Sequence, residues 1–268
     1  MILSRSLLAI LIVCALGCSI SAQTTKSAKP KNYPAIVKDS PQRLVQAERE
    51  WRRLLELYNL KETEAQFYAI THTPRSLAGI ESGIKIIDAP LTGDTTVPVR
   101  EAAKRFIDRW RELLSAQPGT VSLTKNDNTG GIHRLTYKQA DFPFPVAGGY
   151  GEITLVINND GRLLQLDDRF IPVVELPFSP TINRQEAAQR LVNRTFTYKD
   201  AAGNDQQLRI NDLKDVHVKG LVILPVAKKD SLEIHLAWEI LLGDAPSWTV
   251  YLDAIDGAEL KAEQNLKN

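Results

Sequence analysis

Two stretches in which apolar and polar residues alternate, each interrupted by a turn that ends in glycine, dominate the hydrophobic pattern of this chain. The first covers residues 153–166 with Gly161 in its turn, and the second covers residues 250–260 with Gly257 in its turn. A period of two is typical of a strand with one buried face. Both turns place Asp before Gly, and these residue types tolerate the positive φ angles of a two-residue hairpin. The pattern therefore predicts two β-hairpins, each closing a section that begins with an amphipathic helix.

Three stretches have the spacing of amphipathic helices. Ser40 followed by Pro41 favours the start of the first, because Ser caps helices and Pro fits their first position. The second has the clearest apolar stripe, which consists of Val99, Ala102, Ala103, Phe106, Ile107, Trp110, Leu113 and Leu114. Asn183 with Glu186 three residues later is a capping pair that predicts the start of the third.

The remaining apolar runs predict strands and an α+β fold. Strand candidates cover residues 64–71, 121–125, 132–139, 208–210, 216–224, 232–242 and 248–252. Strands that follow a single helix indicate antiparallel sheets with helices packed on one face. We therefore expect two tandem units, each a helix with an antiparallel sheet.

The polar segment 126–131 is similar in composition to a calcium-binding loop. It lacks an acid or amide at Thr129 and a closing Glu, so we interpret it as a turn between two strands.

The N-terminus predicts export. Residues 1–22 have a basic start, a short apolar core and a small-residue cleavage region, which is the pattern of a signal peptide. Cleavage there would leave Gln23 first, followed by a flexible lead over residues 23–40, in a periplasmic or extracellular protein. An alternative is a lipoprotein in which Cys18 is lipidated. Cys14 and Cys18 both lie inside the signal, so the mature chain would contain no disulfide.

Composition gives no reason to propose nucleic acid or an anionic membrane as a partner. The chain has 33 Lys and Arg against 32 Asp and Glu, for a formal net charge of +1. A neutral chain without basic runs attracts polyanions weakly. No stretch of the mature chain is apolar and long enough to predict a transmembrane segment.

Few residues suggest chemistry, and we expect neither catalysis, nor a metal, nor a cofactor. The four histidines, His72, His133, His217 and His235, are far apart and none has a second His four residues on. We interpret each as a strand or turn residue. No Gly-x-Ser-x-Gly elbow is present, and the glycine-rich segment 148–151 precedes a strand where a phosphate cradle needs a helix. The pair Asp167 and Asp168 is interpreted as solvated surface charge.

Aromatic residues divide into two groups. Trp110, Trp238 and Trp248 lie on predicted helical or strand stripes, which favours core packing. Phe142 and Phe144 lie between prolines in a short connection, where they could face a partner, although packing under the loop is the stronger interpretation.

Several motifs resemble the pro-region of the thermolysin and fungalysin metalloproteases, in which a fungalysin/thermolysin propeptide (FTP) motif precedes a PepSY domain. The motifs are Thr-Pro-Arg-Ser-Leu-Ala-Gly at 73–79, Glu-Ala-Ala-Lys-Arg-Phe at 101–106, Pro-Val-Ala-Gly-Gly at 145–149, Leu-Ala-Trp-Glu at 236–239 and the segment 248–257. The similarity runs from about Thr73 to about Leu266. The chain lacks the family's peptidase domain, whose zinc-binding helix carries two His and a Glu.

The resemblance implies a domain organisation. We divide the chain into a signal peptide (1–22), a flexible lead (23–40), an N-terminal helix with short strands (41–96), an FTP-like unit (97–179), a PepSY-like unit (180–262) and a tail (263–268).

The resemblance also implies a function, because such pro-regions assist the folding of their protease and inhibit it. We therefore expect a non-catalytic regulator of a thermolysin- or fungalysin-type metalloprotease. Its partner-binding residues would be Phe142 and Phe144, with Lys261, Glu263 and Leu266 near the C-terminus. Two alternatives are a cell-envelope structural or ligand-binding domain without a protease partner, and the front part of a longer protease precursor.

Overall fold

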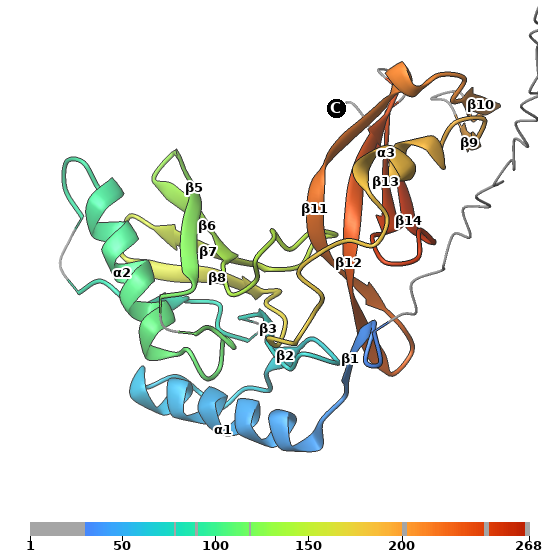
Figure 1. The fold of residues 1–268 in the computed structure, drawn as a ribbon. Coiled ribbons are helices and arrows are strands. Elements are labelled where there is room, and N and C mark those ends of the chain that lie inside the picture. The colour runs from blue at the N-terminus through green and yellow to red at the C-terminus, as the bar shows by residue number, and fades with distance from the viewer. Residues whose placement is uncertain are drawn as a thin grey trace, which may run out of the picture.

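The computed structural model describes residues 30–77, 79–88, 91–117, 119–199, 203–243 and 247–265. The predicted signal peptide, both cysteines and Leu266 lie outside the described residues. The fold is α+β, with antiparallel strands and three α-helices in the part of the chain that is described. The strands form two larger sheets in two units that stand side by side (Figure 1).

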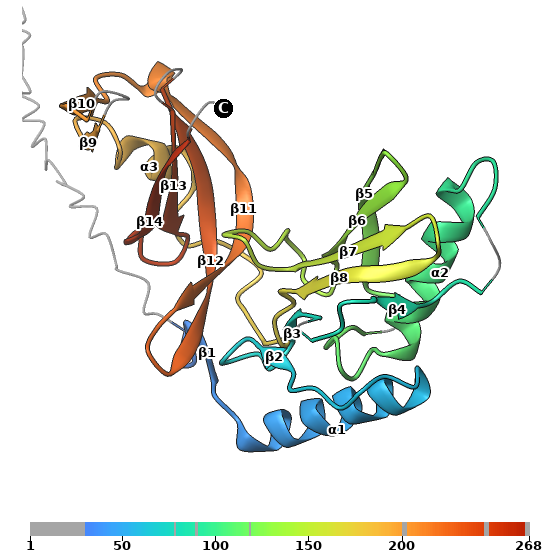
Figure 2. The same cartoon turned by 180° about the vertical axis from the view of Figure 1, so that it is seen from behind.

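The first unit packs two helices against a five-stranded antiparallel sheet of order β4-β8-β7-β6-β5 (Figure 2). Its helices are α1 (Pro41–Leu57) and α2 (Thr96–Arg109). The sheet consists of β4 (Ile84–Lys85), β5 (Val121–Thr129), β6 (Ile132–Gln139), β7 (Glu152–Asn158) and β8 (Arg162–Asp168). A small separate sheet pairs β2 (Gln66–Phe67) with β3 (Pro74–Ser76).

One hydrophobic core joins both helices to this sheet. Trp51 from α1, Phe106 from α2 and Leu155 from β7 are all buried in it. The predicted cap is confirmed, because the Ser40 hydroxyl accepts a hydrogen bond from the Arg43 N–H at 3.4 Å. Because α1 and β4 contribute to the same core as the later strands, residues 41–96 belong to one unit with the sheet that follows. This corrects our prediction that the two are separate.

The predicted stripe of α2 is buried, but the helix is shorter than the stripe. It ends at Arg109, and Trp110, Leu113 and Leu114 are buried from the turns that follow. The apolar spacing therefore identified the core residues correctly and overestimated the helix.

Two predicted strand limits were wrong in the first unit. Of the strand expected over residues 64–71, only β2 forms, because the chain turns back where the His72 N–H donates to the Tyr68 carbonyl. The polar segment 126–131 is mostly strand, since β5 continues to Thr129 and pairs with β6. Only Gly130 and Gly131 form the turn, both at positive φ.

The second unit is organised around the long strand β12 (Ser231–Leu242). On one edge β12 pairs with β11 (Val216–Ala227) over its whole length. On the other edge its first part pairs with β1 (Ala35–Lys38) and its second part with β13 (Ser247–Asp253). The outermost strand is β14 (Glu259–Asn265), which pairs with β13.

Shorter elements complete this unit. They are α3 (Arg184–Gln189), β9 (Thr195–Lys199), β10 (Asp205–Arg209) and a single 3₁₀ turn (Leu213–Asp215). The predicted capping pair is confirmed, because the Asn183 and Glu186 side chains each accept the other residue's backbone N–H at 2.9 Å. Of the hairpin formed by β9 and β10, only β10 overlaps a predicted strand. The sequence of β9 gave no strand prediction.

Both ends of the second sheet correct our expectations. Residues 35–38, placed in a flexible lead, are the strand β1, because their main chain completes the edge of β12. Residues 263–265, placed in a tail, continue β14 as far as Asn265. The strand pairs in each case are separated widely in sequence, which no local pattern reveals.

A loop of the first unit contacts the second sheet directly. Ile223 of β11 donates its N–H to the Pro145 carbonyl at 2.9 Å and accepts the Ala147 N–H at 2.9 Å. This parallel bridge covers part of the outer edge of β11. The described residues contain no helix long and apolar enough to cross a membrane.

The turn between β7 and β8 requires glycine for two reasons. Gly161 has φ 71°, and a Cβ on it would lie 2.6 Å from the Ile87 carbonyl oxygen. Asn159 and Asp160 do not have positive φ, so the predicted two-residue hairpin turn is in fact a three-residue connection whose last residue alone is left-handed.

We expect Gly161→Ala to destabilise the protein clearly more than Gly93→Ala. Gly93 also has positive φ, 71°, but no atom lies within 4 Å of a Cβ placed there. The control substitution therefore introduces only backbone strain. In Gly161→Ala, overpacking against Ile87 should add about 1–3 kcal/mol to the loss of unfolding free energy. Denaturant unfolding measures both losses. Equal losses would show that the approach to Ile87 is not tight.

Candidate functional site

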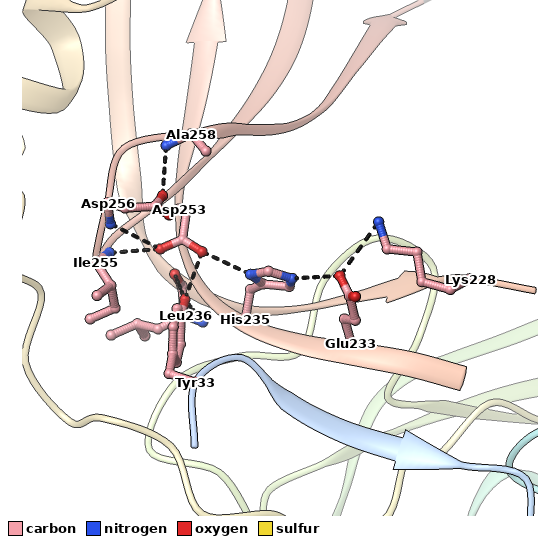
Figure 3. Close-up of polar contacts among 9 residues, drawn as sticks. All are labelled: Tyr33, Lys228, Glu233, His235, Leu236, Asp253, Ile255, Asp256 and Ala258. Carbon is pink, nitrogen blue, oxygen red and sulfur yellow. Dashed lines mark hydrogen bonds and ion pairs between the residues drawn. The ribbon is translucent and has the colours of Figure 1, made fainter. Parts of the chain in front are cut away.

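A polar cluster with a buried centre lies where the edge of β12 changes partner from β1 to β13 (Figure 3). Its centre is the pair His235 and Asp253, whose Nδ1 and Oδ2 atoms are 2.8 Å apart. We call this group, with Tyr33, Glu233 and Lys228, the His235 cluster. Glu233 lies 3.5 Å from His235 Nε2 and 3.4 Å from Lys228 Nζ. The side chains thus form a line from solvent into the sheet.

Tyr33 replaces a missing strand at this position. No strand pairs with Leu236 on the edge that β1 leaves and β13 has not yet reached. The Tyr33 hydroxyl accepts the Leu236 N–H at 3.1 Å and lies 3.1 Å from the Leu236 carbonyl oxygen. The Ala254 N–H also donates to that carbonyl, at 2.8 Å. The main chain of β12 is therefore satisfied across the gap.

Asp253 holds the cluster together because both of its carboxylate oxygens are used. Oδ2 accepts from His235 Nδ1 and lies 3.0 Å from the Tyr33 hydroxyl. Oδ1 accepts the N–H groups of Ile255 at 2.8 Å and Asp256 at 3.3 Å, which fixes the turn after β13. A buried carboxylate is tolerated when donors surround it in this way.

The connection between β13 and β14 covers residues 254–258 and contains the predicted left-handed Gly257, but it is longer than the expected two-residue turn. Gly257 has φ 74°, and a Cβ there would lie 2.5 Å from the Arg190 guanidinium carbon. Its N–H donates to the Asp253 carbonyl at 2.8 Å. The turn is thus held both by main-chain bonds and by the carboxylate.

Burial gives the Tyr33 hydroxyl a pKa above its ordinary value, and the adjacent Asp253 carboxylate raises this pKa further. The hydroxyl therefore stays protonated and can donate to Asp253. A His–Asp pair at this distance can orient an imidazole for proton transfer. In the part of the chain that is described, however, no Ser or Thr hydroxyl hydrogen-bonds to His235. The geometry of the His235–Asp253 pair therefore fits a structural role better than the activation of a nucleophile.

The other histidines occupy strands and turns, as predicted. His133 of β6 is fully buried, with Nε2 2.7 Å from the Thr95 hydroxyl, and burial lowers its pKa. Its Nδ1 has no partner within the described chain, so no third group orients it as a catalytic base requires. His72 lies in a turn at φ 56°, bonded to Asp39 at 2.7 Å. His217 is exposed on β11.

No set of three potential metal ligands is grouped together among the described residues.

Asp168 contradicts the interpretation of Asp167 and Asp168 as solvated charges. Its side chain is fully buried at the end of β8, and burial raises the pKa of the carboxyl well above its ordinary value. Oδ1 accepts the Phe170 N–H at 2.9 Å, whereas Oδ2 has no partner among the described residues. Asp167 is half-buried, and its carboxylate accepts from the Tyr68 hydroxyl at 2.8 Å and pairs with Arg169. Alternation in a strand that ends in two acids could have indicated that one of them points inward.

The structure separates the predicted partner-binding residues into two places. Phe142 and Phe144 lie in the connection from β6 to β7 and pack, partly buried, against the core of the second unit. Lys261 and Glu263 form an ion pair on β14. The bridge at Ile223 belongs to β11, and β12 and β13 lie between β11 and β14. The segment that follows Phe144 and the ion pair on β14 are therefore at opposite edges of one sheet.

Sequence reasoning missed the His235 cluster. Tyr33 lies in the segment predicted to be a flexible lead, and His235 was interpreted only as a strand or turn residue. The two residues are far apart in the chain, because 203 positions separate Tyr33 from Leu236, the residue after His235. Asp253 gave the only local signal, because an acid at the start of a glycine turn often accepts nearby N–H groups.

Comparisons with known proteins identify no family for this chain. No family model matches the sequence. No curated protein matches it either. Among solved structures, it is similar to the Bacillus megaterium YpeB C-terminal domain at 14% sequence identity and a TM-score of 0.37, over 86% of this chain and 99% of that one.

We expect Asp168→Asn to stabilise the protein at neutral pH. The folded state holds a proton on Asp168 that the unfolded state releases above its ordinary pKa of 3.8. Wild-type stability should therefore fall as pH rises from about 4 toward the raised folded pKa. The variant keeps an acceptor for Phe170 without that pH-dependent loss.

Denaturant unfolding at several pH values measures this difference, with exposed Asp108→Asn as the control. The advantage of the Asp168 variant should be small near pH 4 and grow with pH, while the control follows wild type. Parallel profiles for wild type and Asp168→Asn, or a less stable variant at neutral pH, would contradict a protonated Asp168.

Proposed function

We propose that this chain is a non-catalytic recognition module that regulates a metalloprotease of the thermolysin or fungalysin type by binding an extended segment of it along β14. The observation that supports this most directly is the unpaired outer edge of β14. Within the described residues, β14 pairs with β13 on one side and with no strand on the other. Such an edge offers a row of main-chain donors and acceptors to a partner strand.

The strand is held firmly enough to serve as a template. Asn265 at its end accepts from the Thr249 hydroxyl at 3.1 Å and donates to the Ser247 hydroxyl at 3.3 Å. Lys261 and Glu263, which form an ion pair, place charge along the edge. Charges along an edge strand restrict which strands can pair with it, because a partner has to place complementary groups opposite them.

A non-catalytic role is consistent with the His235 cluster. The Asp253 carboxylate is engaged by four donors, and the imidazole contacts carboxylates on both nitrogens. These groups tie strands together and present no nucleophile. The protease partner itself is inferred from the motifs that resemble pro-regions.

Export belongs to the same proposal. A regulator of a secreted protease would have to leave the cytoplasm, and residues 1–22 have the pattern of a signal peptide. The mature chain would begin at Gln23, or at a lipidated Cys18 in the alternative.

Proline substitution at neighbouring positions of β14 tests the edge. Consecutive N–H groups of a strand point to opposite sides, so one of Ala262→Pro and Glu263→Pro removes a bond to β13 and the other removes a free outer donor. We expect wild type to slow a thermolysin-type protease from its own source. The more stable of the two variants should bind it about tenfold more weakly, because one main-chain hydrogen bond is lost.

The assay follows hydrolysis of a small peptide substrate at increasing concentrations of the chain, with gels to verify that the chain stays uncut. Thermal unfolding ranks the two proline variants. If wild type neither inhibits the protease nor assists its refolding at high micromolar concentration, the proposal fails and the envelope-domain alternative replaces it. Unchanged inhibition by both variants would exclude the β14 edge as the site.

A further inference from the structure

The connection between the two units contains a second surface with the features of a peptide-binding groove. Residues 172–180 lead from β8 to α3 without forming a helix or strand. No main-chain N–H or C=O of these residues is hydrogen-bonded within the described part of the chain. A row of unpaired backbone groups at the surface is a template for strand addition.

The segment is nevertheless held in an extended conformation. Val174 and Leu176 point inward and pack against the core of the second unit, whereas Val173 and Glu175 are exposed. This alternation is that of a strand with one anchored face. Pro172 and Pro177 add to it, because the residue before a proline favours extended backbone.

The exposed side of the segment is unusually apolar. The Phe178 side chain is 74% exposed and that of Val173 55% exposed. Phe142 and Pro143, from the connection between β6 and β7, form the opposite wall of a groove of about 380 Å³. Large apolar side chains gathered at one surface mark an interaction site more often than scattered ones do.

The charge of the groove selects the occupant. Asp141 and Glu175 line it, and no Lys or Arg does so among the described residues. Asp141 accepts a hydrogen bond from the Gln139 side chain at 3.2 Å, and neither acid is in an ion pair in the described structure. An extended segment with a basic residue beside an apolar one would complement both features.

We propose that this linker groove, formed by Phe142, Pro143, Val173, Glu175 and Phe178 with Asp141, binds an extended peptide segment of a partner protein. The segment adds as a strand to residues 173–176, inserts an apolar side chain beside Phe178 and places a Lys or Arg against Asp141 and Glu175. This surface is separate from the β14 edge, so it stands whether or not the protease proposal does.

Selection from a randomised library of eight-residue peptides on the purified chain tests the proposal. We expect the selected peptides to combine an apolar residue with Lys or Arg. Their affinity, measured by fluorescence anisotropy, should fall about tenfold or more with Phe178→Ser, because the apolar contact is lost. N-methylation at alternate peptide positions should abolish binding, since it removes the main-chain donors of the added strand.

Matched variants separate this result from general effects. Val45→Ser removes a side chain that is 62% exposed on α1, outside the groove, and should leave peptide affinity unchanged. Glu175→Lys should remove the selection for basic residues, because the new ammonium offsets the charge of Asp141. Both Phe178 and Glu175 are exposed, so these variants are expected to fold, and thermal unfolding verifies this.

Three outcomes would overturn the proposal. The first is a library that yields no peptide binding above background, and the second is a set of peptides with equal affinity for wild type and Phe178→Ser. If wild type forms a dimer by analytical ultracentrifugation and Phe178→Ser is a monomer, the groove is occupied by a second copy of this chain and not by a partner. None of these outcomes depends on inhibition of a protease.

Discussion

The second unit depends on one arrangement, in which a tyrosine hydroxyl and a carboxylate close the gap along β12. β1 ends its pairing at Ile234 and β13 begins at Ala237, so Leu236 would otherwise leave polar main-chain atoms inside the sheet. An unpaired buried backbone group costs about 1–3 kcal/mol. Tyr33 supplies the missing partner, and Asp253 holds the Tyr33 hydroxyl while it also fixes the turn after β13. The N-terminal segment is thereby a structural part of a sheet made mostly from the last fifty or so residues.

Two buried aspartates show how the environment decides the role of the same side chain. Asp253 accepts hydrogen bonds from His235, Tyr33 and two backbone N–H groups, and it links three segments of the chain. Asp168 receives a single backbone N–H, and burial keeps its pKa high. Asp253 is a fully hydrogen-bonded carboxylate that connects segments of the chain. Asp168 is a carboxyl that the folded state favours in its neutral form. The same residue type therefore acts in one place as a hydrogen-bonded link between segments and in the other as a buried neutral carboxyl.

Local patterns predicted the elements well and their long-range relations poorly. The α+β class, the caps at Ser40 and Asn183 and the glycine turns at 161 and 257 follow from spacing and residue type within a few positions. β1 was missed because four residues that complete another strand's edge have no periodicity of their own. The interior position of Asp168 was missed because both acids were interpreted by their charge and not by the alternation of the strand, which places one of them inward. Tyr33 and His235 could not be associated, since only the three-dimensional pairing of β12 brings them together.

The central claim is that Tyr33 and Asp253 act as one unit that closes the sheet, and a double-mutant cycle tests it most directly. The free energy of unfolding would be measured for wild type, Tyr33→Phe, Asp253→Asn and the double variant. The account predicts that each single change is destabilising and that the double variant loses less than their sum, with a coupling energy of about 1 kcal/mol or more. Additive losses, within about 0.5 kcal/mol, would contradict it by showing that the two groups stabilise the structure independently.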